Sequence, residues 1–486
     1  MTTRNFLITL CVEQSLFHSF SEEEKQKIVD DVKAYLSLLA ENFYTEKVAV
    51  SCTMQYSSYH AIQINNQEFR VAKVYRPCYS YEENSTYWTL RFSEALFYHR
   101  EMVLVGSFNP DKLEAERIQI QPCFSQKNVQ PTVEMHRLRI DVTSKVYTSP
   151  HNIDSFSREE YVAAWHSQLY YDKGVLVPKP TFHIDDTLPE TGFRIWINDL
   201  PYPVLHSFPE NYFMEMPAVT SGEVIGNPHD VNHPHFATIH VLKNSNELQP
   251  ETDTCFAWMG MLNLMTSAVV QLHASCWINK TFIAFQLDEQ PLHADVLALA
   301  LEQYTMEDIV YFLKRLSEER IPIRNLKKLL HLLTYEQDAM YGDAGTIAFG
   351  STSALTVIYS ENKKLQGKDL IVESLRRGLQ EETAVSISKD NNFNALIMGV
   401  TVEETWLQLD MDGERKLFNG VLDSIETQLT EIPRNTKLHG VVCQDFIRPS
   451  LAAYLQKIHP WLCVYSYRDL APWINVTPLG YINVVM

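Results

Sequence analysis

A histidine-rich segment holds the side chains of this sequence that are best suited to metal chemistry. The segment NPHDVNHPHFATIH, residues 227–240, contains His229, Asp230, His233, His235 and His240. Imidazole and carboxylate groups are ordinary ligands of zinc and nickel, but this spacing matches no helical site such as HExxH. Its prolines and asparagines are typical of a loop. We therefore expect a solvated loop without a bound metal ion.

Two other segments have only part of the pattern of a ligand-binding loop. The Gly/Ser/Thr-rich stretch at 341–354 lacks the Lys that a phosphate-binding loop needs, so we expect a connector between helices. The DMDGE stretch at 410–414 begins like a calcium loop, but Val421 stands where the distal Glu belongs, and a surface turn is expected. The sequence shows no Ser-nucleophile, paired-carboxylate or Cys–His motif. We therefore predict no catalytic residues and no cofactor.

The charge and composition favour a protein that binds other proteins. The formal net charge is −19, which argues against a surface for nucleic acid or for anionic lipid. No apolar stretch is long and uninterrupted enough to predict insertion into a membrane. The eight cysteines form no CxxC pair and are expected to be reduced thiols in a cytosolic protein. The 24 Tyr and 8 Trp suit recognition surfaces, although they also suit a packed core.

The last hundred residues show the clearest pattern of elements. Two short apolar strands, 438–443 and 462–466, flank a helix whose apolar stripe includes Leu451, Leu455 and Ile458. Strand, helix and strand in this order predict a right-handed βαβ unit with parallel strands. The final segment, INVTPLGYINVV, is predicted to add a further strand at the edge of the sheet, where a Pro is tolerated.

Residues 303–384 are predicted to be mainly helical. The first helix begins with a capping box made of Thr305 and Asp308, followed by an apolar stripe at helical spacing. Two further helices are predicted from the leucines of 326–333 and from those of 370–379.

Two segments in the first half of the chain resemble each other. Residues 48–71 and 181–204 each pair an early alternating strand with a later one, AIQINN or RIWIND, and a turn-forming Asn follows the later strand. An internal duplication and a chance likeness of two hairpins both fit this pattern.

These elements predict an α+β multidomain fold. It would have mixed N-terminal domains, a helical subdomain and a C-terminal α/β subdomain of the βαβ type. The expected boundaries are 1–150, 151–302, 303–385 and 386–486, with the first domain a degenerate copy of the next.

Four stretches, in this order and spacing, resemble the cytoplasmic domain of the type III secretion and flagellar export-gate family, FHIPEP. The resemblance covers 157–486. LSEERIPIRNLKKLLHLL (316–333) is similar to the family's helix–turn–helix, and DFIRPSLAAYLQKIHPWLCVYSYRDLAPWINVTPLGYI (445–482) is similar to its C-terminal segment. GVLVPKPTFHIDDTLPETGFRIWINDLPYPV (174–204) and QLHASCW (271–277) resemble its first subdomain and the helix end before its helical subdomain.

The resemblance implies a docking and assembly role without catalysis. Family members form a nonameric ring beneath a membrane channel, where they receive chaperone–substrate complexes. The partners implied are export chaperones, secreted substrates and other export-apparatus proteins. FAWMGMLNLM (256–265) departs from the family near the chaperone groove, and partner contacts are expected at Phe256, Trp258, Leu264 and Met265. Ring contacts are expected from the helical subdomain at Arg320, Arg324 and Asn325.

Two other classes of function also fit the sequence. One is a scaffold in another bacterial assembly, because the family's membrane part has no counterpart in these residues. The other is a metal- or nucleotide-dependent enzyme whose site is assembled from distant residues. With the export-gate role, the expected location is the cytoplasm, peripheral to the inner membrane through a partner protein.

Overall fold

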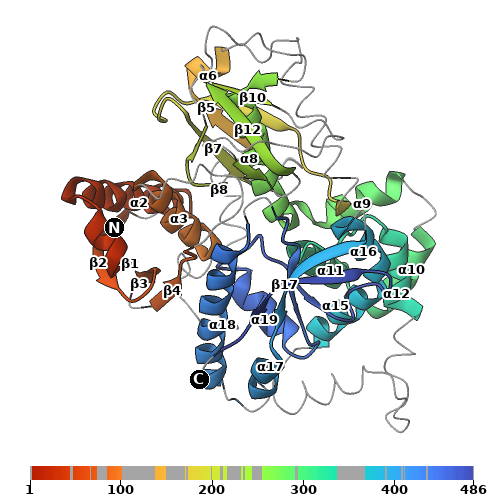
Figure 1. The fold of residues 1–486 in the computed structure, drawn as a ribbon. Helices are drawn as coiled ribbons and strands as arrows, with labels where there is room; N and C mark the ends of the chain where they lie inside the picture. Colours follow the sequence, from red (N-terminus) through yellow and green to blue (C-terminus); the bar gives the residue numbers. More distant parts are fainter. Residues whose placement is uncertain are drawn as a thin grey trace. The chain divides into compact units, whose positions relative to one another are not determined.

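The computed structural model describes residues 3–335 and 367–484 apart from internal gaps, the longest of which are 74–84, 101–136, 149–169, 216–230 and 244–253. The chain divides into two compact units. The first unit contains residues 1–162, 178–268 and 457–459, and the second contains 163–177, 269–456 and 460–486. Their described residues include two mixed sheets, one antiparallel sheet, one parallel sheet and many helices, which confirms the predicted α+β multidomain fold (Figure 1).

The first sheet of unit one has the strand order β2-β1-β3-β4. β1 is parallel to β2 and antiparallel to β3, which forms a hairpin with β4. The long helix α2, Glu22–Phe43, packs on β2, and the neighbouring strand β1 buries its apolar side chains Ile8 and Leu10. The bounds are β1 Thr3–Glu13, β2 Lys47–Ser57, β3 Ala61–Ile64 and β4 Gln67–Arg70.

The second sheet repeats the strand order and strand directions of the first. Its order is β6-β5-β7-β8, with β5 parallel to β6 and antiparallel to β7, and with β9 pairing β7. The two hairpin turns each place an Asn in the left-handed region, Asn65 at φ 48° and Asn198 at φ 49°. The bounds are β5 Leu138–Val142, β6 Pro180–Ile184, β7 Gly192–Ile197, β8 Leu200–Pro201 and β9 Leu205–His206.

In the hairpin of the first sheet, Ile62 pairs with Phe69 and Ile64 pairs with Gln67. We propose that residues 1–100 are a copy of the module that follows them, on the strength of the shared strand order. Because β5 belongs to the second sheet, we also propose that the second module begins before residue 138 rather than at 151.

Helix α3, Ser85–Tyr98, contacts both modules, and nine of the ten residues from Trp88 to Phe97 are buried, all except Thr89. The carboxylate of Glu94 accepts a hydrogen bond from the Tyr202 hydroxyl at 2.6 Å, and the Phe97 ring packs edge-on against Tyr202. On the other side of the helix end, His99 stacks on Phe69 of β4. A helix buried on all sides must satisfy its polar groups internally, and Arg91 pairs with Glu94 for this reason.

A third sheet in unit one has the order β11-β12-β10-β13. It corrects the expectation of a loop throughout 227–240, because His233 ends one strand and His240 lies in another. These two strands pair antiparallel, Val231 with Ile239 and His233 with Phe236. His229, Asp230 and His235 lie outside the described residues. The bounds are β10 Tyr212–Glu215, β11 Val231–His233, β12 Phe236–Lys243 and β13 Thr254–Phe256.

Helices dominate the first part of unit two. The Thr305–Asp308 capping box is present in both directions and starts α11, as predicted. The 341–354 stretch lies outside the described residues. Helix α8, Ala257–Leu272, belongs to unit one up to Ala268 and to unit two from Val269. The other bounds are α9 Lys280–Glu289, α10 Ala294–Gln303, α11 Met306–Glu318, α12 Leu326–Tyr335, α15 Gly367–Gly378 and α16 Gln380–Ile387.

The C-terminal sheet is wholly parallel, with the order β16-β15-β14-β17. The predicted βαβ unit is confirmed as β15, α19 and β16, with Leu451 and Leu455 fully buried, and β17 lies at the edge as predicted. The expected turn at 410–414 is wrong, because α18 begins at Met411. The bounds are β14 Asn392–Met398, α17 Val400–Trp406, α18 Met411–Glu431, β15 Gly440–Cys443, α19 Arg448–Leu455, β16 Val464–Ser466 and β17 Asn475–Ile482.

Candidate assembly and docking sites

The turn after α11 carries the first residue expected to form assembly contacts, Arg320. Helix α11 ends in a Schellman motif, in which the N–H of Ile321 donates to the Leu316 carbonyl and that of Arg320 to the Ser317 carbonyl, both at 2.9 Å. Arg320 occupies the left-handed position of this motif, at φ 60°, where Gly is usual. A side chain there costs about 1 kcal/mol relative to the right-handed conformation. The Arg is therefore held in a conformation that its type disfavours.

A strap formed by residues 173–177 crosses this turn. The Lys173 carbonyl accepts a hydrogen bond from the N–H of Ile323 at 3.0 Å, and the Lys173 ammonium donates a hydrogen bond to Ser386 Oγ at 2.9 Å. Gly174, at φ 76°, lies so close to Arg324 that an added Cβ would come within 2.2 Å of the Arg324 backbone nitrogen. Only Gly fits this position, for reasons of both space and conformation.

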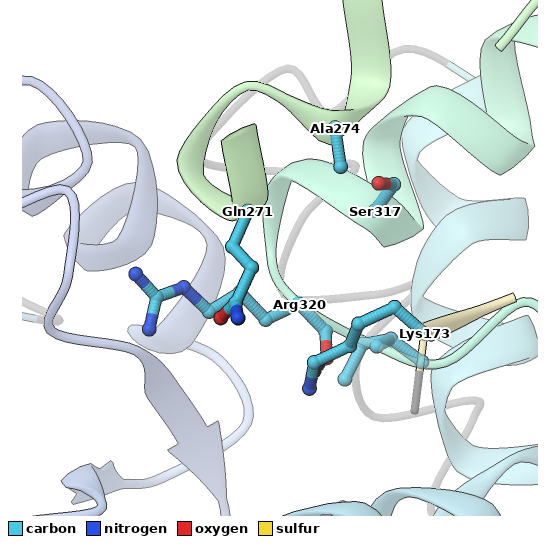
Figure 2. Close-up of a pocket in the computed structure, with 6 residues that line it drawn as sticks. Lys173, Gln271, Ala274, Ser317 and Arg320 are labelled. Carbon is cyan, nitrogen blue, oxygen red and sulfur yellow. Dashed lines mark hydrogen bonds between the residues drawn. The ribbon is translucent and has the colours of Figure 1, made fainter. Parts of the chain in front are cut away.

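A small pocket lies between the strap and the end of α11 (Figure 2). Lys173 and Arg320 line it together with Gln271 and Ser317. The ammonium of Lys173 is already engaged with Ser386 and the Arg320 carbonyl, so this pocket offers little to a ligand.

The other two residues expected to form assembly contacts lie just before α12. Arg324 and Asn325 are both exposed. Asn325 caps α12, because its Oδ1 accepts from the N–H of Lys328 at 3.1 Å. Its amide also reaches Glu382 of α16 at 3.4 Å, and Lys328 Nζ donates to the same carboxylate at 2.9 Å. The cap thus fixes the start of α12 against α16.

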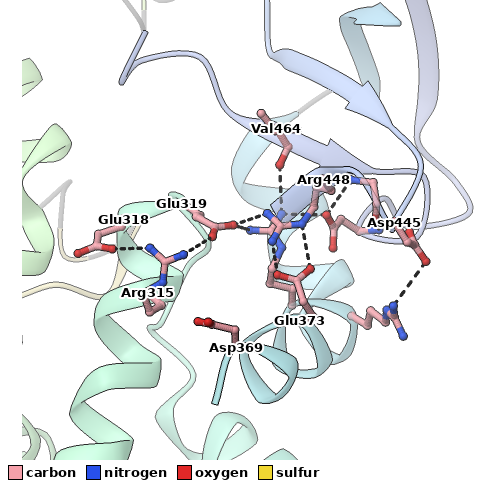
Figure 3. A network of polar contacts seen from close by, with 12 residues as sticks. Arg315, Glu318, Glu319, Asp369, Glu373, Asp445, Arg448 and Val464 are labelled. Carbon is pink, nitrogen blue, oxygen red and sulfur yellow. Dashed lines mark hydrogen bonds and ion pairs between the residues drawn. The ribbon is translucent and has the colours of Figure 1, made fainter. Parts of the chain in front are cut away.

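A buried cluster of charges joins the helical part of unit two to its parallel sheet. Glu319 at the end of α11 contacts Arg376 of α15 and Arg448 of α19 (Figure 3). Arg448 also forms a two-pronged contact with Glu373, and Arg376 donates to Asp469 at 2.8 Å and to the Val464 carbonyl at 3.3 Å. The Arg376 side chain is fully buried and that of Arg448 is 1% exposed. These groups fix α11, α15, α19 and the turn after β16 to one another.

The electrostatics of this cluster follow from burial and from the two guanidinium groups. Burial alone would raise the pKa of Glu319, but Arg448 and Arg376 hold it below its ordinary value. Asp469 behaves in the same way, chiefly through Arg376. For Glu373, burial outweighs the attraction of Arg448, and its pKa is raised. Such a cluster has no access for a substrate, and it suits a structural role.

The residues expected to contact a partner lie at the end of β13 and on α8. Phe256 ends β13, and Trp258, Leu264 and Met265 lie on α8. The Met265 side chain is 2% exposed, so in this conformation it packs inside the protein rather than on its surface. The side chains of the other three lie outside the described parts of the structure.

Sequence reasoning did not find the charge cluster. Its members are far apart in the chain, from Glu319 to Asp469, so no local pattern shows that they meet. One available signal was Arg448, a charged residue directly before Pro449 at the start of the predicted helix of the βαβ unit.

Two further observations on the described residues concern metal binding and membrane crossing. No three His, Cys, Asp or Glu side chains among them are grouped so that they could hold a metal ion. No helix in the described ranges combines the length and the apolar character needed to cross a membrane.

Several solved structures have the same fold as this chain. The CdsV protein of Chlamydia pneumoniae matches with a TM-score of 0.54 at 16% identity, over 73% of this chain and 100% of that one. CdsV in its complex with CdsO matches with a TM-score of 0.53 at 16% identity, over 74% and 99%. The nonameric SctV-C of EPEC matches with a TM-score of 0.50 at 12% identity, over 73% and 100%. Identities this low show a shared fold and nothing more.

No curated protein matches the chain. The model of the FHIPEP family matches residues 100–475, which is well over half of the sequence. The chain belongs to the FHIPEP family.

Proposed function

We propose that this protein is an assembly and docking component of a type III secretion export platform, without catalytic activity. Membership of the FHIPEP family is the observation that carries this proposal. The fold shared with CdsV supports it, and that protein is described in complex with a second protein, CdsO. The proposed location is the cytoplasm, at the inner membrane through a partner.

The proposed assembly is a homo-oligomeric ring. The structurally similar SctV-C of EPEC is described as nonameric, and the helical part of unit two is the segment we assign to ring contacts. Its exposed Arg324 follows the strained Arg320 by four residues, and the same helical part carries the acidic residues Glu318 of α11 and Glu381 of α16. Mixed charge allows one face to meet a different face of the next subunit, which is the geometry that closes rings. The net charge of −19 opposes this association in dilute solution.

The proposed cargo is a chaperone with its secreted substrate, docked near β13 and α8, and other export-apparatus proteins are the remaining partners. The apolar segment 256–265 supports this placement, because apolar and aromatic side chains provide most of the energy of protein interfaces. This docking needs no metal or nucleotide.

The experiment is light scattering of the full chain over a rising concentration series, at low and high salt. We expect a monomer or weak oligomer in dilute solution and higher assemblies when concentrated. Arg320→Glu/Arg324→Glu should weaken this assembly, and more strongly at low salt, where charges are least screened. Arg415→Glu/Lys416→Glu is the matched control, because it makes an equal change of charge at exposed positions near the start of α18. A mass of one chain at every concentration, even with the native partner present, would rule out the ring.

A further inference from the structure

One face of the second sheet concentrates positive charge in an otherwise acidic protein. Side chains alternate between the two faces of a strand, and Leu138, Ile140 and Val142 of β5 are buried on the core face. The opposite face carries Arg139 and Asp141 of β5 together with the residues that pair with them, Thr181 and His183 of β6 and Trp196 and Arg194 of β7. We call this surface the β5–β7 face.

Two more cations extend this face. Arg137 and Lys179 come two residues before Arg139 and Thr181, just ahead of the first residues of β5 and β6, and both are exposed. The N–H of Asn198 donates to the Arg137 carbonyl at 3.0 Å, which continues the β5–β7 pairing by one residue, and we infer from continued alternation that both side chains extend the same side. The face therefore holds four permanent cations, Arg137, Arg139, Lys179 and Arg194, besides His183. Two carboxylates lie among them, those of Asp141 and Asp185. The face is positive in a chain whose net charge is −19.

The centre of the face is organised in advance by Asp141, whose side chain is only 3% exposed. Arg139 pairs with this carboxylate through Nε at 2.9 Å and through Nη2 at 3.3 Å, and Trp196 donates its indole N–H to it. The Arg139 guanidinium stacks over the Trp196 ring at 3.9 Å. His183 Nδ1 lies 3.4 Å from the same carboxylate, while the imidazole stays 61% exposed.

This arrangement orders the Arg139 side chain before any partner arrives. A stacked and paired guanidinium has already lost its rotamer freedom, so a partner that binds it has less entropy to remove. Arg139 keeps 38% of its side chain exposed, beside the exposed imidazole of His183. Arginine and tryptophan are also the residue types enriched in the strongest contacts of interfaces.

We propose that the β5–β7 face docks a short, extended, acidic segment of a partner protein. Arg137 lies just before β5 and Arg139 lies on it, and a spacing of two residues in extended backbone is about 6.6 Å. Carboxylates at every second position of an extended peptide have the same spacing. This surface lies on β5, β6 and β7 of unit one, and the proposal does not depend on the ring or on docking at α8.

A nucleic acid fits this face less well. The five residues of β5 span roughly 17 Å, whereas a nucleic acid carries a charge at every few ångströms and continues past the patch. The net charge of −19 on the chain also opposes the binding of a long polyanion. A short acidic peptide, in contrast, is short enough for its carboxylates to lie over the positive patch.

The test uses the full chain and a fluorescein-labelled octapeptide of alternating Glu and Thr, followed by fluorescence anisotropy at low salt. We expect saturable binding that weakens as salt is added. Arg137→Glu/Lys179→Glu should weaken it at least tenfold, since it reverses two exposed cations and leaves the Asp141 cluster in place. Arg415→Glu/Lys416→Glu makes the same two changes on α18 and should leave binding within twofold.

Three results would overturn the proposal. The first is no binding of the octapeptide at low salt. The second is an equal loss of binding in both double variants, which would mean that the affinity for the peptide depends only on the net charge of the chain. The third is tighter binding of a thymidine octanucleotide than of the peptide, lost in Arg137→Glu/Lys179→Glu, which would assign the face to nucleic acid.

Discussion

The buried charge cluster of unit two predicts an unusually costly single substitution, Glu319→Gln. The Glu319 carboxylate contacts Arg376 and Arg448, and Arg315 Nη2 lies 3.5 Å from it. Gln has nearly the same shape, so packing is preserved. The change removes the one anion that both buried guanidinium groups share, and it leaves two like charges facing each other in a site where water cannot screen them.

The expected loss of stability is large because the substitution removes only one partner of a buried ion pair. Removing one partner of a buried ion pair costs about 3–5 kcal/mol, since the remaining charge is left uncompensated. For a unit of this size that loss lowers the melting temperature by roughly 6–20 °C. The adjacent Glu318→Gln is the matched control, because the Glu318 side chain is 31% exposed and pairs only with the part-buried Arg315 in the described structure. A pair of that kind contributes about 1 kcal/mol or less.

The assay is thermal and urea unfolding of the full chain, with hydrogen exchange of α15 and α19 to assign the transition to unit two. The pH dependence gives a second test. The pKa of Glu319 is lowered in the fold, so its contribution is present above the ordinary Glu value near 4.5 and is lost as the pH falls through the folded value. The difference between wild type and Glu319→Gln should therefore shrink on acidification below about pH 4.5. Equal costs for Glu319→Gln and Glu318→Gln, or a cost under about 1 kcal/mol for the former, would refute the reasoning.

Three further substitutions test the elements around this cluster. Arg320→Gly should stabilise the chain by about 0.5–1 kcal/mol in urea unfolding, because Gly adopts the left-handed conformation at φ 60° without strain. A loss of stability would show that the Arg320 side chain makes a contact that stabilises the fold by more than the strain costs. Gly174→Ala should cost about 2–3 kcal/mol, as a new Cβ meets the Arg324 backbone, and an unchanged melting curve would mean that the strap is not docked there. Leu455→Asp should cost at least about 3 kcal/mol, because it places an unpaired charge at a position that is 0% exposed; wild-type melting would mean that the register of α19 is wrong.

Elements with strong local patterns could be predicted from the sequence. The capping box at Thr305 and Asp308 needs only four residues, and the two strands around α19 are short apolar runs bounded by polar residues. In each case the stabilising contacts lie close together in the chain, so the residue types alone determine the structure. The prediction for the DMDGE stretch was wrong for the opposite reason. The helical residues that follow it extend α18 into a segment that has the composition of a turn by itself.

The candidate sites could be predicted only in part, because their decisive contacts are non-local. Arg320 was singled out for its charge, but its left-handed backbone and its place in a Schellman motif appear only in three dimensions. Met265 was expected to contact a partner because it is apolar in an unusual segment, and apolar character by itself does not distinguish an exposed position from a buried one.

The charge cluster links these observations to the proposed function. A buried network of two Arg and three acidic groups adds less stability than apolar packing of the same volume would, because each charge loses its hydration. What such a network can supply is a defined geometry, since a displaced partner leaves a charge unpaired. Here that geometry fixes the end of α11, next to Arg320 and Arg324, relative to the parallel sheet. A subunit that closes a ring needs its contact surface held at one angle, because a small error per subunit accumulates around the ring and leaves it open.

If the ring forms as proposed, Glu319→Gln should impair assembly under conditions in which the chain is still folded, whereas Glu318→Gln should not. Light scattering of both variants below their melting temperatures would separate this role from simple stability, because a purely stabilising cluster predicts that folded Glu319→Gln assembles like the wild type.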